Sequence, residues 1–190
     1  MPSLVPPALP AGTLAALTQP TLDGADGLRL RPWRAEDAAT VAAAYADPDI
    51  QRWHCRSMTG DEAHDWIEHW QSRWQAETGA GWAVTDAGGA VAGQIGLRRI
   101  TLAAGHAEVS YWVLPAARGR RVAGRALDTL TGWSFGTLGL HRVEVCHSTR
   151  NLASCRVADR AGYHLEGTKR GEVRHLDGWH DMHLHARVHG

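Results

Sequence analysis

The sequence predicts a single α+β domain built on a mixed, mostly antiparallel twisted sheet. Helical and strand-like hydrophobic patterns alternate in the order β-α-α-β-β-β-α-β-α-β-β, which combines hairpins with crossover helices and so includes one locally parallel pair. Apolar residues make up 44% of the 190 residues and charged residues 21%, as in an ordinary globular protein. We expect one domain over residues 26–190.

Residues 1–25 are rich in proline, alanine and threonine and have no periodicity, which predicts a flexible tail or a strap across the domain surface. The first Lys or Arg is Arg29, so a signal peptide is not expected. Eighteen consecutive apolar residues occur nowhere, so no membrane span is predicted. Three cysteines without a CxxC spacing fit reduced thiols, and we expect a cytoplasmic protein.

The charge balance bears on possible partners. Twenty basic and twenty acidic residues cancel, which argues against a nucleic-acid-binding module and against an anionic membrane as partner. A small molecule or a peptide remains as partner, and a monomer and a homodimer are both open.

The periodic segments follow in order along the chain. An alternating strand at 28–32 precedes an alanine-rich helix that ends at Asp47-Pro48. A second helix starts near Thr59 and carries a tryptophan every fourth residue, which predicts a core face. Further strands are expected from Trp82, over 91–102, 107–114 and 141–147 and within 163–188, with helices over 121–138 and 151–161.

The most informative stretch is AEVSYWVLPAARGRRVAGRAL, an apolar strand followed by a proline, an Arg-Gly loop and a helix. A helix N-terminus presents unpaired N–H groups and partial positive charge, so such a loop suits a phosphate or pyrophosphate. The loop region contains four arginines, Arg118, Arg120, Arg121 and Arg125. A solvated basic turn is the alternative.

Together with HRVEVCHSTRNLASCRVADRAGY, this stretch resembles the GNAT acetyltransferases, and most closely the ribosomal-protein N-terminal acetyltransferases (the Rim-type branch). The resemblance runs from about Leu28 to Val188. It implies a GNAT-like sheet flanked by about four helices, with splayed central strands that hold acetyl-CoA. It also implies an N-acetyltransferase that moves the acetyl group to a primary amine by direct attack in a ternary complex. The acceptor would be a protein or peptide N-terminus or a small-molecule amine.

The resemblance also assigns the cofactor site. The family loop Arg/Gln-x-x-Gly-x-Gly/Ala matches 118–123, with Arg121 at the position that is usually glycine, so Arg121 either points outward or contacts a phosphate. A match shifted to 121–126 falls inside the predicted helix. The implied cofactor-binding residues are Trp112, Val113, Leu114, Arg118, Gly119, Arg120, Arg121, Val122, Ala123, Asn151 and Ser154.

Roles follow from the same resemblance. The strand around 111–113 would bind pantetheine through its backbone and stabilise the oxyanion. Asn151 would meet pantetheine and Ser154 would help the thiolate leave, although both positions also suit helix capping. Many relatives use a tyrosine as acid one turn further on, where this chain has Ala158. Tyr163 is expected in the core.

Glu108 is the candidate base, because it precedes the pantetheine strand. It could act through water, bind the ammonium, or be a salt-bridged strand residue. An α-amine costs about 1 kcal/mol to deprotonate at pH 7 and a lysine about 4 to 5, so an α-amine needs little base catalysis.

Histidine, cysteine and tryptophan positions leave further alternatives. Asp181, His183 and His185 share one strand face, which suits either a metal or a solvated polar face; we expect no metal. Cys155 is either a thiol acidified near a helix start or a packing residue. Candidates for an acceptor cleft are His54, His106, His147, His175, Trp33, Trp53 and Trp82, with core packing as the alternative for the tryptophans.

A rival to the enzyme is a non-catalytic acyl-CoA-binding or sensor module of the same fold. It is motivated by Arg121 in place of glycine and Ala158 in place of tyrosine. This rival predicts coenzyme A binding without turnover.

Overall fold

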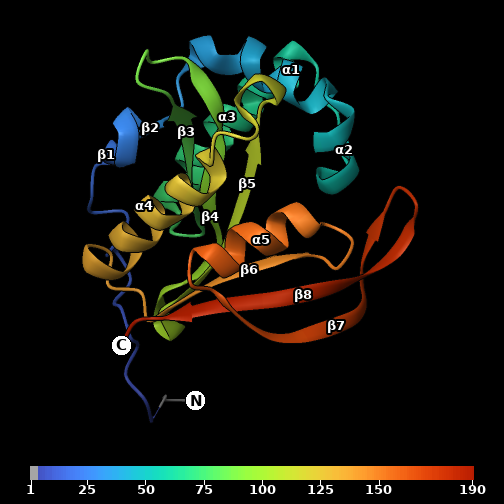
Figure 1. Ribbon diagram of the computed structural model, residues 1–190. Helices are drawn as coiled ribbons and strands as arrows, with labels where there is room; N and C mark the ends of the chain where they lie inside the picture. Colours follow the sequence, from blue (N-terminus) through green and yellow to red (C-terminus); the bar gives the residue numbers. More distant parts are fainter. Residues whose placement is uncertain (1–3) are drawn as a thin grey trace.

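A computed structural model describes residues 4–190, which form one eight-stranded sheet in the order β1-β2-β3-β4-β5-β6-β8-β7 (Figure 1). Every neighbouring pair is antiparallel except β5 and β6, which are parallel. The strands are β1 (Leu22–Asp23), β2 (Arg29–Pro32), β3 (Gly79–Thr85), β4 (Val91–Thr101), β5 (His106–Val113), β6 (Arg142–Ser148), β7 (His164–His175) and β8 (Gly178–Val188). The expected α+β architecture is confirmed.

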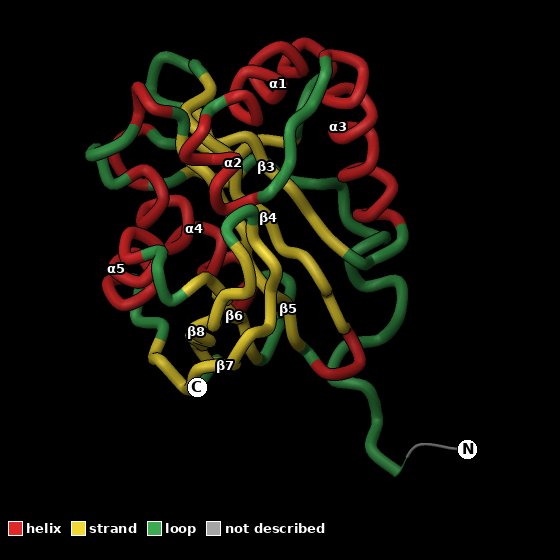
Figure 2. Tube along the Cα trace, turned by 90° about the vertical axis from the view of Figure 1, so that its right-hand side faces the viewer, coloured by secondary structure: helices red, strands yellow, loops and turns green. Residues whose placement is uncertain are grey.

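Helices cover both faces of this sheet. They are α1 (Ala38–Ala46), α2 (Pro48–His54), α3 (Gly60–Gln75), α4 (Val122–Gly136) and α5 (Leu152–Arg160). Figure 2 shows the sheet between α1 and α3 on one side and α4 and α5 on the other. Among the described residues, none of the helices has the length and apolar character needed to cross a bilayer.

The helix α2 is one more than the sequence analysis expected. Asp47 and Pro48 do end α1, but they also begin the next helix, because the Asp47 side chain accepts a hydrogen bond from the Ile50 N–H and Pro48 occupies the first helical turn. Both are favoured start signals for a helix. The short helix α2 then carries His54 to the backbone of β5, where its Nε2 lies 3.2 Å from the Tyr111 carbonyl.

The tryptophan face of α3 packs as expected. Trp70 and Trp74 are buried and Trp66 is partly buried. Trp70 lies so close to Gly81 of β3 that a Cβ at Gly81 would meet its ring at 2.3 Å. A glycine is therefore required there to bring α3 onto the sheet.

The segment before β1 lies along the domain. Leu14 is fully buried, and the Glu77 carboxylate accepts hydrogen bonds from the N–H groups of Gly12, Leu14 and Ala15. Further along, the Trp82 indole N–H donates to the Pro20 carbonyl at 2.9 Å. These contacts hold residues 12–20 against β3 and the end of α3.

Candidate active site

The strands β5 and β6 separate after four paired residues. Their parallel register runs from His106–Arg142 to Val109–Val145 and stops there, and Figure 1 shows the two strands diverging beyond it. A strand that loses its neighbour leaves backbone N–H and C=O groups that an extended ligand can use. The gap between β5 and β6 is therefore a natural site for a pantetheine arm.

Hydrogen-bond parity identifies which residues of β5 face this gap. The Leu114 N–H donates to the Ala92 carbonyl at 2.9 Å, so the even-numbered residues of β5 bond to β4. In an antiparallel pair the alternate residues direct both backbone groups away from that partner. Tyr111 and Val113 therefore direct their N–H and C=O groups away from β4, and the Val113 carbonyl accepts a hydrogen bond from the Arg118 Nε at 3.4 Å.

This geometry bears on part of the expected cofactor set. Val113 faces the gap, but Trp112 pairs with Gln94 on β4 and its side chain is buried. The Leu114 N–H bonds to β4 and its carbonyl accepts from the Ala117 N–H, so its N–H is not free for a ligand. The resemblance identifies the strand but not the parity of its ladder, and cofactor binding by Trp112 and Leu114 stays a prediction.

A cavity of about 460 Å³ occupies the gap and the space beside it. Residues of β5 and β6 form its centre, and α2, α3, α5 and the β7–β8 hairpin form its walls. Of the expected residues, Glu108, Asn151 and Ser154 line it. The structure thus brings the proposed catalytic pair into one cavity.

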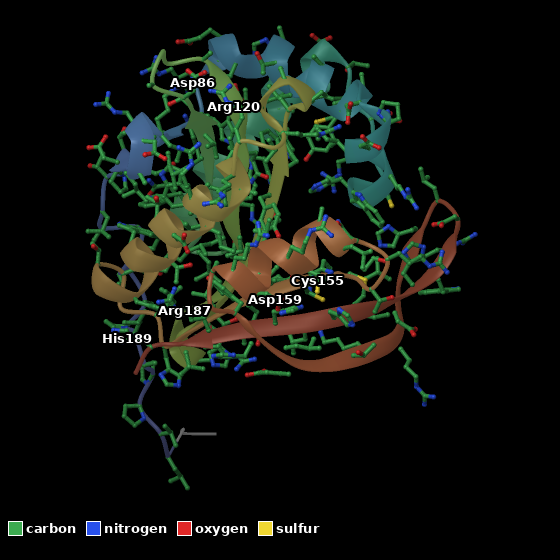
Figure 3. All side chains as sticks on the ribbon, in the orientation of Figure 1. Asp86, Arg120, Cys155, Asp159, Arg187 and His189 are labelled. Atoms are coloured by element: carbon green, nitrogen blue, oxygen red, sulfur yellow. The ribbon has the colours of Figure 1, made fainter. Side chains whose placement is uncertain are left out.

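The Arg-Gly loop lies beyond the end of β5 and leads into α4; Figure 3 labels Arg120 in it. Arg121 is the residue before the first turn of α4 and has φ 56°, and its side chain makes no capping hydrogen bond. A positive φ is the conformation that glycine tolerates best, which explains why glycine is usual at this position. Arg121 keeps that backbone shape with its side chain exposed.

The loop arginines divide into two groups. Arg118 forms ion pairs with Asp47 at 2.6 Å and Asp49 at 2.7 Å, and so ties the loop to the start of α2. The Arg125 guanidinium pairs with Asp26. Arg120 and Arg121 are exposed and, within residues 4–190, pair with no carboxylate. Those two guanidinium groups and the N-terminus of α4 are suited to phosphate.

Glu108 is buried and held by two arginines. Arg98 is its direct partner across the β4–β5 ladder and bonds to Oε1, while the Arg99 Nη1 donates to Oε2 at 3.0 Å. Consecutive side chains normally point to opposite faces of a sheet. Here a bulge follows Arg98, and Arg99 adopts φ 53°, which turns both guanidinium groups toward Glu108.

The start of α5 forms the other side of the gap. The Asn151 side chain accepts a hydrogen bond from the Ser154 N–H at 3.0 Å, so the capping role of Asn151 is observed directly. The Tyr111 hydroxyl donates to the Ser154 carbonyl at 3.5 Å. Burial raises the pKa of Tyr111 to about 12, so the phenol stays protonated near neutral pH. Ala158 is fully buried.

His54 closes the gap from the α2 side. Its Nε2 lies 3.2 Å from the Tyr111 carbonyl, and because a carbonyl only accepts, Nε2 carries the proton. Burial lowers the pKa of His54 to about 4, so the ring is neutral near neutral pH. The Tyr111 carbonyl that parity directs into the gap is thereby satisfied.

The residues proposed for an acceptor cleft fall into two groups, those that line the cavity and those that do not. His54, His147, His175 and Trp53 line the cavity, whereas Trp33 and Trp82 are buried in the cores. His106 is not among the lining residues. Tyr163 is buried as expected, with its hydroxyl 2.5 Å from the Thr131 Oγ1.

Three contributors to the site were not predicted from the sequence. They are the Tyr111 hydroxyl, the hydrogen bond between His54 and the Tyr111 carbonyl, and the pair Arg98 and Arg99 that holds Glu108. Tyr111 stood inside the recognised strand, but only the backbone of that strand was considered. The adjacent arginines shortly before Glu108 were a visible signal. Their convergence depends on a bulge that no residue pattern announces.

Splayed parallel strands, a basic loop at a helix N-terminus and a cavity at the gap between the strands are the features expected of an acyltransferase fold that binds coenzyme A. Comparison with known proteins agrees. Residues 27–164 match the family model "Acetyltransferase (GNAT) domain", and the chain belongs to this family.

Individual relatives share the fold at low identity. The chain is 34% identical over 73 residues to "Probable N-acetyltransferase YjcK" of Bacillus subtilis (strain 168), a match that spans 38% of this chain and only 40% of that protein. RimL, a ribosomal alpha-N-protein acetyltransferase solved with coenzyme A, has a TM-score of 0.82 at 17% identity, covering 89% of this chain and 98% of RimL. Mycobacterium smegmatis RimJ, solved with a CoA-disulfide, has a TM-score of 0.80 at 23% identity, covering 97% and 90%.

Proposed function

We propose that the protein transfers an acetyl group from acetyl-CoA to an α-amine, as found at a peptide or protein N-terminus or on a small molecule. The cavity at the gap between β5 and β6 carries this proposal, because Tyr111 and Ser154 line the same cavity as Glu108 and residues of α2 and α3. Acyl donor and amine can then meet in one ternary complex. No acyl-enzyme is required.

Each residue has one proposed role. Arg120, Arg121 and the first N–H groups of α4 hold the pyrophosphate. The Val113 and Tyr111 backbone N–H groups bind the pantetheine arm and the oxyanion. Ser154 binds the coenzyme A sulfur, and the protonated Tyr111 hydroxyl beside it supplies the proton to the departing thiolate.

Glu108 serves the acceptor. Two guanidinium groups fix the orientation of its carboxylate, yet each oxygen keeps further acceptor capacity for a water or an ammonium group. An α-amine is already partly neutral at pH 7, whereas a lysine costs about 4 to 5 kcal/mol to deprotonate. A carboxylate that acts through water suits the α-amine better.

Thiol release from acetyl-CoA tests the acceptor. Peptides with a free N-terminus are compared with Nα-blocked peptides that contain one lysine. We expect at least tenfold higher kcat/KM for the free N-terminus, on the difference in deprotonation cost. Faster turnover of the Nα-blocked lysine peptides would contradict the α-amine assignment.

Two variants with matched controls test the catalytic pair. Glu108→Gln and Ser154→Ala should each lower kcat by roughly 10- to 100-fold while coenzyme A affinity holds. Glu144→Gln is the control for Glu108, because Glu144 lies opposite it on β6 but bonds to Arg142. Ser72→Ala, on the exposed side of α3, is the control for Ser154. Full rates in both catalytic variants would refute their roles.

The alternative of an acyl-CoA-binding or sensor module rests on Ala158. That residue is fully buried and offers no acid at the usual place. The module predicts tight coenzyme A binding with no thiol release for any amine, which the same assay detects.

A further inference from the structure

A compact group of metal-ligating side chains lies beneath α5, beside the catalytic cavity. His147 of β6, Cys155 of α5, and His183 and His185 of β8 each place one ligand atom within 4.8 Å of all the others. His147 and His183 are direct partners across the β6–β8 ladder, and His185 follows His183 by two residues. The three rings therefore share one face of the sheet.

The helix α5 covers this face and supplies the fourth side chain. Figure 3 shows Cys155 and Asp159 on the side of α5 that faces β8. The Cys155 Sγ lies 3.9 Å from the His185 Nε2. His185 is fully buried and His147 is 6% exposed. Of the face shared by Asp181, His183 and His185, only Asp181 is exposed, and the alternative of a solvated polar face is wrong for His185, because α5 packs over it.

Hydrogen bonds fix the proton positions on two of the rings. The His147 Nδ1 donates to the Ser148 carbonyl at 2.8 Å, and the His185 Nδ1 donates to the Tyr163 carbonyl at 3.2 Å. A neutral imidazole with a protonated Nδ1 has its lone pair on Nε2. Such a bond from the outer nitrogen is how metal-binding histidines are held in proteins.

Two of the ring nitrogens in this group have no hydrogen-bond partner among the described residues. The His147 Nε2 and the His183 Nδ1 are buried and have no hydrogen-bond partner within residues 4–190. Buried polar atoms are almost always satisfied, so unsatisfied ones require an explanation. One ligand atom of each of the four side chains lies within 4.8 Å of the others, so their lone pairs are close to one common point. A cation between them would satisfy all of them at once.

We propose that His147, Cys155, His183 and His185 bind one divalent transition-metal ion, with Zn²⁺ preferred. Imidazole and thiolate are the ligands that Zn²⁺ favours, and four protein ligands make a closed, structural site. Bonds of about 2.0 to 2.3 Å in a tetrahedron place ligand atoms about 3.3 to 3.6 Å apart. The 3.9 Å between Cys155 and His185 requires a small contraction, whereas ligand atoms up to 4.8 Å apart must approach each other by about 1 Å as the ion binds.

Asp159 adds an outer contact. Its Oδ1 lies 3.5 Å from the His185 Nδ1. On binding, the Cys155 thiol would lose its proton to solvent and the sulfur would bond to the ion, while the three histidines stay neutral. The ion would tie β6 and β8 to α5, the helix whose first turn carries Ser154. This site does not depend on the acetyl acceptor.

The proposal is tested by cobalt and zinc titrations of the metal-free chain of 190 residues, in a buffer that contains a non-thiol reductant. We expect one equivalent of Co²⁺ to produce the intense visible bands of a tetrahedral site and a thiolate-to-cobalt charge-transfer band, both removed by Zn²⁺. Competition with a chromophoric chelator gives the Zn²⁺ affinity. The melting temperature should rise with Zn²⁺.

Variants locate the site. Cys155→Ser should abolish the charge-transfer band, and His185→Gln should weaken Zn²⁺ binding more than tenfold, since even outer partners contribute 10- to 100-fold. Cys55→Ser, Cys146→Ser and the exposed His164→Gln are matched controls and should bind as the unmodified protein does. Melting curves without metal show whether each variant is folded.

Three results would overturn the proposal. One is no Co²⁺ spectrum and no Zn²⁺ competition by the unmodified protein. Another is an unchanged charge-transfer band in folded Cys155→Ser. The third is loss of the band in Cys55→Ser, which would place the ion at the separate Cys55–His175 contact of 3.4 Å.

Discussion

The Tyr111 hydroxyl lies 3.5 Å from the carbonyl oxygen of Ser154 and so connects β5 to the first turn of α5 across the gap. This contact puts a protonated phenol, with its pKa raised to about 12 by burial, beside the residue proposed to bind the coenzyme A sulfur. The usual tyrosine of the family is replaced by the buried Ala158. Tyr111 lies on β5, across the gap from α5, and its hydroxyl contacts the first turn of that helix.

Replacement of Tyr111 by phenylalanine should therefore lower kcat by about 100-fold, the lower end of the range for acid–base catalysis. The dissociation constant of coenzyme A should change by less than about threefold, because the backbone of β5 is retained. Tyr163→Phe is the control: it removes the hydrogen bond to Thr131 in the core and should lower the melting temperature without slowing turnover. Equal kcat for Tyr111→Phe and the unmodified enzyme would remove Tyr111 from the mechanism.

The loop arginines should differ in their effects. Arg120→Ala and Arg121→Ala should each weaken coenzyme A binding by about fivefold, or about 1 kcal/mol, in a salt-dependent way. Neither should lower stability by more than about 0.5 kcal/mol, because both side chains are exposed. Calorimetric titration at two salt concentrations gives the affinities. Unchanged affinity in both variants would leave the helix N-terminus alone as the phosphate site.

Arg121→Gly separates the backbone from the side chain. Glycine suits the φ of 56° but costs backbone entropy, so we expect a stability change within about 1 kcal/mol. If the guanidinium contacts phosphate, coenzyme A affinity should fall as in Arg121→Ala. An affinity equal to that of the unmodified protein would show that Arg121 only points outward.

His54 should make the protein sensitive to mild acid. Its folded pKa of about 4 lies below the usual 6.5, so the neutral ring contributes stability that is fully present above pH 6.5 and is lost as the pH falls toward 4. The shift of the His54 pKa from 6.5 to about 4 corresponds to about 3 kcal/mol of unfolding free energy. Because the ring is partly exposed, we expect a loss of about 2 kcal/mol.

Denaturant melts between pH 7 and 4 measure this loss. His54→Gln retains an N–H donor for the Tyr111 carbonyl but does not titrate, so its stability should fall less over that interval. The exposed His164→Gln is the control and should follow the unmodified protein. Parallel curves for His54→Gln and the unmodified protein would contradict the assignment.

Much of the fold could be predicted because local signals and tertiary packing agree. Thr59 and Glu62 form the reciprocal cap that begins α3, and Gly139 and Gly162 follow α4 and α5 with positive φ. The extra helix α2 was missed because Asp47-Pro48 signals both an end and a start, and only the end was inferred.

The site was less accessible to prediction because its details are tertiary. Alternation along β8 separates His185 from Met182, but it cannot show that α5 covers the histidine face. The register between β4 and β5 decides that the Leu114 N–H bonds to β4 and that the Val113 N–H points away from it. These features follow from the partners of a strand and not from its own residues.

The central claim is that acetyl-CoA and an amine meet in the cavity between β5 and β6 and react directly. Initial rates of thiol release, measured with both substrates varied and with mass spectrometry of the acetylated peptide, test it most directly. We predict intersecting double-reciprocal lines and one acetylated α-amine per free coenzyme A. Parallel lines would indicate an acyl-enzyme, and tight coenzyme A binding without acetylation of any amine would contradict the enzyme assignment itself.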